Sequence, residues 1–117
     1  MEKVDLETFL KLDLRGKVFC FPTDTVYGVG ALYDDHDAIS RIFKLKHRDL
    51  KKPLALLTAT KDIGEYVEEV SEAAKELMNT RWPGALTLIF NKSDKISDEV
   101  TNGFKTIAFR MPNSKIA

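Results

Sequence analysis

Four short apolar runs, each near a proline, most constrain how this chain folds. They occupy 17–21, 54–57, 86–90 and 106–111, and the prolines are Pro22, Pro53, Pro83 and Pro112. Proline has no amide hydrogen to donate and holds the preceding residue extended, so it favours the borders of strands. A further extended run at 26–32 follows the first. The sequence therefore predicts a twisted, mixed sheet of four or five short strands.

Segments with helical spacing alternate with these runs. Apolar residues recur every three or four positions in 5–14, 38–45, 63–70 and 71–80. Asp5, one of Asp34, Asp35 and Asp37, and Ser71 are candidate N-caps, and the polar segment 91–104 is predicted to be a loop. This alternation indicates an α/β (α+β) fold with helices flanking the sheet, in a single domain over residues 1–117.

Composition excludes some classes of protein. The 18 basic residues balance the 18 acidic ones, so a nucleic-acid partner would require a local basic patch. The single cysteine, Cys20, lies in an apolar run and is predicted to be buried. His36 and His47 lack metal-ligand spacing with each other or with Cys20, so no metal site is expected. With no window apolar enough for a membrane span, the chain is predicted to be soluble and cytoplasmic.

Three groups of residues have the chemistry of an anion site. Thr23-Asp24-Thr25 is a turn rich in hydroxyls and acceptors, and Lys46-His47-Arg48 follows a helix whose apolar stripe directs Lys46 inward. In the last strand Thr106, Ala108 and Arg110 share one face, where the arginine fork suits a carboxylate. Alternatively, the turn satisfies only local amides, and the cations at 44–52 only complement a helix C-terminus.

The residues resemble the YrdC-like domain of threonylcarbamoyl-AMP synthases, which act in tRNA threonylcarbamoyladenosine modification. Four segments carry the resemblance, in the family's order: 21–28 (FPTDTVYG), 46–48 with 52–54 (KHR, KPL), 82–88 (WPGALTL) and 106–112 (TIAFRMP). The resemblance implies that L-threonine, bicarbonate and ATP, with Mg²⁺ accompanying the nucleotide, give threonylcarbamoyl-AMP and pyrophosphate. It also implies roles for particular residues: Thr25 and Arg110 bind threonine, Lys46 and Arg48 are the catalytic cations, and Lys46, Arg48, Lys52 and Thr106 bind ATP.

The sequence departs from the family pattern in two ways, and these departures leave other functions open. The family's Ser-x-Asn segment is absent from this sequence, so we expect a C-terminally shortened, truncated domain, and Leu57 stands where many members have histidine. The alternatives to a synthase-like domain are a non-catalytic module that binds double-stranded RNA, tRNA or a nucleotide through 44–52, and a copy without activity. A shortened sheet would expose an edge or an apolar face, so a homo-oligomer is expected.

Overall fold

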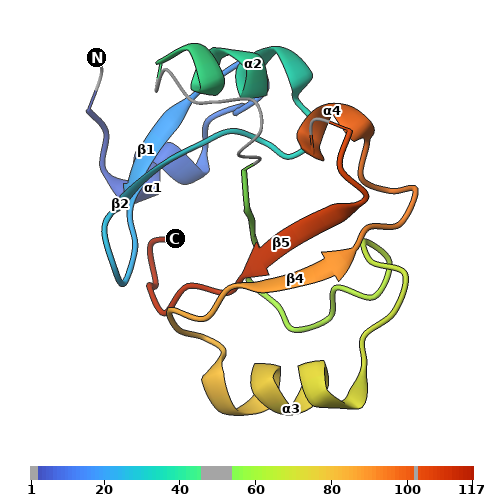
Figure 1. Ribbon diagram of the computed structural model, residues 1–117. Helices are drawn as coiled ribbons and strands as arrows, with labels where there is room; N and C mark the ends of the chain where they lie inside the picture. Colours follow the sequence, from blue (N-terminus) through green and yellow to red (C-terminus); the bar gives the residue numbers. More distant parts are fainter. Residues whose placement is uncertain (1–2, 46–53, 102) are drawn as a thin grey trace.

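The computed structural model describes residues 3–45, 54–101 and 103–117. Helices and strands alternate along the chain, as the sequence predicts (Figure 1). The helices are α1 (Leu6–Leu10), α2 (His36–Leu45), α3 (Glu72–Arg81) and α4 (Asp98–Thr101). The strands are β1 (Phe19–Pro22), β2 (Tyr27–Gly30), β3 (Leu56–Leu57), β4 (Leu88–Asn91) and β5 (Thr106–Arg110). The predicted mixed α+β architecture is confirmed.

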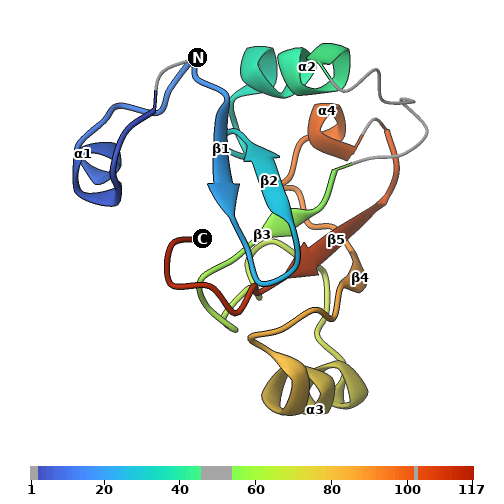
Figure 2. The same ribbon diagram turned by 90° about the vertical axis from the view of Figure 1, so that its left-hand side faces the viewer.

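The described strands form two sheets rather than the single sheet of four or five strands that we predicted. β1 and β2 make an antiparallel hairpin, while β3, β5 and β4 form a second sheet in that order. In the second sheet β3 runs parallel to β5, and β4 runs antiparallel to it. The hairpin lies beside the three-stranded sheet and crosses in front of it in Figure 2. Apolar periodicity predicted the strands but could not show which of them pair.

One apolar core lies against a single face of the three-stranded sheet. Ile107 and Phe109 of β5 point into it and are 2% and 3% exposed, while Thr106, Ala108 and Arg110 face the other way. This confirms the predicted alternation of the last strand. The buried side chains that surround these two come from α2, α3, α4, β4 and the connecting segments: Ile39, Phe43, Ile63, Val67, Met78, Trp82, Phe90, Ile96 and Val100.

Two of the predicted caps are confirmed, and the third is resolved. The Asp5 side chain accepts from Thr8 N, and that of Ser71 accepts from Ala74 N. Among the three candidates for α2, Asp35 is the cap, because its Oδ1 accepts from Ala38 N at 3.2 Å. Its Oδ2 accepts from Gly16 N, so the same carboxylate joins α2 to the loop before β1.

Two helical predictions were wrong, one in extent and one in kind. α1 ends at Leu10 rather than Leu14, and its apolar stripe is largely exposed. Segment 63–70 is not a helix: it consists of turns, with Val67 in an isolated bridge to Lys92. Ile63 and Val67 are both buried, which explains the four-residue spacing that resembled a helix.

Further side chains lie where the sequence did not place them. Cys20 is exposed, because Phe19 and Phe21 point to the packed side of the hairpin and Cys20 to the other. Leu45 and Leu77, predicted in buried stripes, are 66% and 41% exposed. The predicted loop 91–104 contains α4, and it adds Ile96 and Val100 to the core.

The hairpin has packing of its own. The ring of Phe21 lies across Gly28 and Gly30 of β2, and a Cβ at Gly30 would come within 2.9 Å of it. The space that a side chain would otherwise fill at these two glycines is therefore occupied by a ring of the neighbouring strand. In the part of the chain that the structure describes, every helix is too short or too polar to span a membrane.

Candidate functional site

The tip of the β1–β2 hairpin reaches the C-terminal end of β5, and this is where the candidate site lies (Figure 2). Pro22 ends β1, and Thr23, Asp24 and Thr25 form the turn. The sequence left two interpretations of this turn open: side chains that satisfy only local amides, or side chains that form a ligand site. Arg110 is the last residue of β5 and projects from the face opposite the core. A turn and a strand that are 85 positions apart in the chain are therefore joined by side chains.

Arg110 holds three parts of the chain together. Its Nε donates to Gly84 O at 3.0 Å, and its Nη1 donates to Thr25 Oγ1 at 3.2 Å. Its Nη2 donates to Asp24 Oδ1, with which it forms an ion pair. Gly84 is also fixed by its own amide, which donates to Met111 O at 2.8 Å. A guanidinium has five N–H donors, so two remain for a ligand.

Asp24 is the anionic partner that our sequence analysis did not assign to the site. Its Oδ2 accepts from Asn113 N at 3.0 Å, and the two charged side chains are only 16% (Asp24) and 14% (Arg110) exposed. The Asn113 amide, reinforced by the charge of Arg110, lowers the pKa of the Asp24 carboxyl below its usual value. Ser114 Oγ adds a bond to Pro22 O at 3.2 Å. The hairpin tip is therefore tied to the segment after β5 at Pro22 and at Asp24.

The two threonines of the turn are in contact with each other. Thr23 Oγ1 lies 3.2 Å from Thr25 Oγ1, and it also accepts from Thr25 N at 3.2 Å. Thr23 Oγ1 donates in turn to Val26 O. These bonds, with that from Arg110, fix the position of the Thr25 side chain.

The structure brings together some of the predicted site residues and leaves others apart. Thr25 and Arg110, the predicted threonine contacts, are in direct contact. Thr106 is exposed at the opposite end of β5, and four residues of strand place it roughly 13 Å from Arg110. Lys46, Arg48 and Lys52 lie outside the described residues, as does most of the basic stretch on which the RNA-binding alternative rests. The sequence did contain a signal for Asp24. It is an acidic residue between two threonines, and the resemblance assigns one of these, Thr25, to the same ligand as Arg110.

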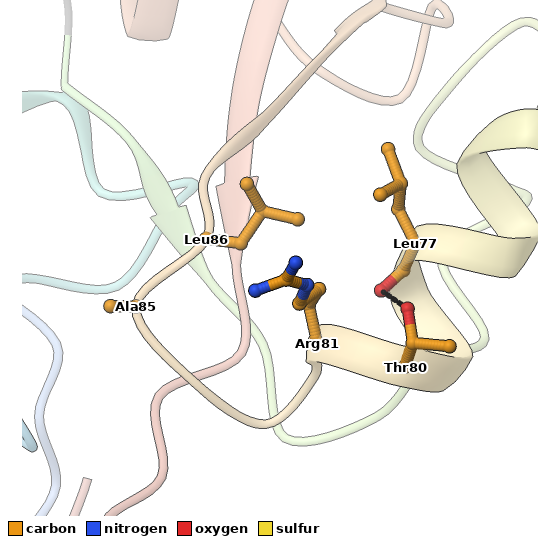
Figure 3. Close-up of a pocket in the computed structure, with 5 residues that line it drawn as sticks. All are labelled: Leu77, Thr80, Arg81, Ala85 and Leu86. Carbon is orange, nitrogen blue, oxygen red and sulfur yellow. Dashed lines mark hydrogen bonds between the residues drawn. The ribbon is translucent and has the colours of Figure 1, made fainter.

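A separate pocket lies at the C-terminal end of α3 (Figure 3). It is lined by Leu77, Thr80 and Arg81 of the helix and by Ala85 and Leu86 of the segment that follows. Thr80 Oγ1 bonds back to Leu77 O at 3.4 Å, so this hydroxyl serves the helix. The pocket contains no predicted site residue and no paired acid and base. It is therefore not the candidate site.

The resemblance noted in the sequence implies that Mg²⁺ accompanies the nucleotide, and Mg²⁺ takes oxygen ligands, chiefly carboxylates. Within residues 3–45, 54–101 and 103–117, no group of three or more His, Cys, Asp or Glu side chains could hold a metal ion. The Asp24 carboxylate already accepts from Arg110 and Asn113. The described residues thus do not fit a metal that the protein itself would hold.

The sequence of this chain is similar to those of known proteins. A family profile described as "Telomere recombination", covering Sua5, YciO and YrdC, matches residues 12–117. The threonylcarbamoyl-AMP synthase of Pyrococcus abyssi is 41% identical over 104 residues, which cover 88% of this chain and 31% of that protein. The Bacillus subtilis protein of the same name is 42% identical over 105 residues, with 88% and 30% covered. The chain thus spans about a third of the length of these relatives.

Solved structures agree with the sequence matches. A crystal structure of P. abyssi Sua5 in complex with L-threonine superposes with a TM-score of 0.82 at 40% identity, covering 86% of this chain and 30% of that one. The crystal structure of Escherichia coli YciO gives a TM-score of 0.77 at 26% identity, covering 95% and 52%. The fold described above is therefore similar to that of both proteins.

Proposed function

Since this chain belongs to the Sua5/YciO/YrdC family, we propose that the site at Thr25 and Arg110 binds L-threonine for a threonylcarbamoyl-AMP synthase reaction. The observation that carries the proposal is the contact between the two side chains, Nη1 to Oγ1 at 3.2 Å, at the end of the strand face opposite the core. A relative of 40% identity whose structure contains L-threonine supports it.

In the proposed reaction the amine of L-threonine takes a carboxyl group from bicarbonate, and water is released. The resulting carbamate oxygen then attacks the α-phosphorus of ATP, a new P–O bond forms, and the bond to pyrophosphate breaks. This chemistry needs no nucleophile from the protein. It needs positioned substrates and donors or cations where negative charge develops.

Each residue contributes to positioning. The two remaining N–H groups of Arg110 would hold the carboxylate of threonine, while Thr25 would contact a polar group of the same molecule. We assign the triphosphate of ATP to Lys46 and Arg48, with Lys52 nearby, and a further nucleotide contact to Thr106. Between Arg110 and Thr106 the outward face of the sheet carries Ala108 and Ile89, a small residue and an exposed apolar one, which suit an extended ligand lying along the strand.

The test is threonine binding by the purified chain, measured by calorimetry, with Arg110→Met and Arg81→Met compared. Arg110→Met keeps an apolar side chain of similar length but removes the guanidinium, so affinity should fall by about tenfold to a hundredfold, the size of a charged hydrogen bond. Arg81 is an exposed arginine of the separate pocket, and its variant should bind like the parent.

Activity is tested by threonine-dependent release of pyrophosphate from ATP in the presence of bicarbonate and Mg²⁺. A chain that binds threonine but releases no pyrophosphate would retain the binding half of the proposal and lose the catalytic half. A parent chain that does not bind threonine would overturn both.

A further inference from the structure

The hydrogen bonds of the hairpin tip assign a direction to the Thr25 hydroxyl. A threonine hydroxyl has one hydrogen to donate and two lone pairs to accept with. Thr23 Oγ1 donates its hydrogen to Val26 O, since a carbonyl can only accept. The same oxygen accepts from Thr25 N at 3.2 Å. With its hydrogen used, Thr23 can take part in the 3.2 Å contact with Thr25 Oγ1 only as the acceptor.

Thr25 is therefore the donor in that contact. Its only hydroxyl hydrogen points at Thr23, and one of its lone pairs receives Arg110 Nη1 at 3.2 Å. One lone pair of Thr25 Oγ1 is left, and Thr25 is an exposed residue. In this arrangement Thr25 can accept a hydrogen bond from a ligand but cannot donate one.

We propose that Thr23 is a specificity-determining residue: by accepting from Thr25, it makes Thr25 an acceptor that selects a ligand with a free hydroxyl hydrogen. The inference deepens the proposed function, on which it rests, and it names the hydroxyl of L-threonine as the donor to Thr25 Oγ1. Arg110 supplies the opposite requirement, because it offers only donors, so the carboxylate faces Arg110 and the hydroxyl faces Thr25. An ether or a methyl group in place of the hydroxyl would leave the lone pair of Thr25 without a partner.

The experiment compares L-threonine, O-methyl-L-threonine and L-valine on the parent chain, on Thr23→Val and on Thr23→Ser, by calorimetry. The parent should bind O-methyl-L-threonine and L-valine at least tenfold more weakly than L-threonine, about the effect of one hydrogen bond left unmade. Thr23→Ser keeps the hydroxyl and should keep these ratios.

Thr23→Val is the decisive variant. It removes the acceptor, so Thr25 can turn its hydrogen to the ligand and donate to the ether oxygen of O-methyl-L-threonine. The ratio of L-threonine to O-methyl-L-threonine affinity should then be at least about threefold smaller than in the parent, while L-valine remains weak. The added methyl group is the same for every variant, so steric cost cancels when the ratios are compared.

The outcomes separate this inference from the proposed function. Threonine binding without discrimination against O-methyl-L-threonine by the parent, or an unchanged ratio in a folded Thr23→Val, would overturn the role of Thr23 alone. If Thr23→Val does not fold, the parent and Thr23→Ser ratios still decide, since loss of discrimination in Thr23→Ser would contradict the inference. Absence of threonine binding by the parent would overturn both proposals.

Discussion

The two sheets of this protein are held in place by different forces. The three-stranded sheet carries the apolar core on one face, where Ile107, Phe109 and Phe90 are almost fully buried. The tip of the β1–β2 hairpin is instead joined to the end of β5 by polar contacts, chiefly those between Asp24, Arg110 and Asn113. We call this set of contacts the polar joint. Both arrangements meet in a single strand, because β5 supplies its odd-numbered residues to the core and Arg110 to the polar joint.

This difference shows why a short strand can serve both stability and binding. Apolar burial is non-directional and depends on area, so it holds the sheet without fixing any polar atom. Hydrogen bonds and ion pairs are directional, so the polar joint fixes atoms such as Thr25 Oγ1 relative to Arg110. Changes in the core should therefore alter stability, and changes in the joint should alter ligand binding first.

The largest effect is expected from Phe109→Ala. Phe109 is 3% exposed and packs near the rings of Tyr66 and Phe90, so its truncation should lower the free energy of unfolding by about 3–5 kcal/mol. Ile89→Ala is the matched control, because Ile89 lies on the neighbouring strand but is 70% exposed. Denaturant unfolding measures both. Equal losses in the two variants would contradict the assignment of the core to one face.

Gly30→Ala tests whether the hairpin depends on packing as well as on its polar tip. The new Cβ would lie 2.9 Å from Phe21, whose ring already packs near that of Phe19, so overpacking should destabilise the protein by about 1–3 kcal/mol. At Gly64 an added Cβ would meet nothing within 4 Å, and Gly64→Ala should be neutral or slightly stabilising. The free energy of unfolding of both variants is measured by the same denaturant titration. An unchanged free energy in Gly30→Ala would show that the Phe21 ring can move away from the added Cβ.

Asp24→Asn should weaken threonine binding more than it weakens the fold. The amide removes the charge that holds Arg110 next to Thr25, so we expect at least a fivefold loss of affinity, about 1 kcal/mol. Asp94→Asn is the control, an exposed aspartate in a turn away from the hairpin tip. Calorimetry with L-threonine provides the readout. Tighter binding by Asp24→Asn would mean that Asp24 competes with the ligand for Arg110, contrary to a positioning role.

Sequence patterns predicted the parts of this fold that depend on neighbouring residues. The alternation of 106–111 was correct because successive side chains of a strand must point to opposite faces. The caps Asp5 and Ser71 were correct because a capping side chain bonds to an amide three residues away. The meeting of Thr25 with Arg110 was expected only through the family resemblance, and the structure now gives its geometry.

What the sequence did not predict depends on distant partners. Segment 63–70 has helical spacing, yet Val67 instead bridges to Lys92, a choice made by the neighbouring segment. Ile96 and Val100 lie in a polar stretch and are buried because the sheet supplies apolar neighbours. The role of Asp24 depends on Asn113, which lies 89 positions away. Local periodicity contains no information about any of these three contacts.

The smallest expected effect is a difference between the core and the polar joint in how the melting temperature depends on pH. The Asn113 amide and, with it, Arg110 lower the pKa of the Asp24 carboxyl in the folded chain, whereas in the unfolded chain the value is about 3.9. A group with a lowered folded pKa contributes stability above its unfolded pKa and loses it as the pH falls through its folded value. The melting temperature of the parent should therefore approach that of Asp24→Asn as the pH falls below the unfolded pKa of the carboxyl, about 3.9.

Phe109→Ala should behave differently over the same range of pH. The lost burial does not involve a proton, so the gap in melting temperature between this variant and the parent should stay nearly constant as the pH falls. Other aspartates with a lowered pKa, such as Asp35, are present in all three proteins, so their titration affects each melting temperature alike. A gap for Asp24→Asn that is also independent of pH would mean that the carboxylate contributes no charge-dependent stability. The contacts at the hairpin tip would then be held by interactions that do not depend on the charge of Asp24.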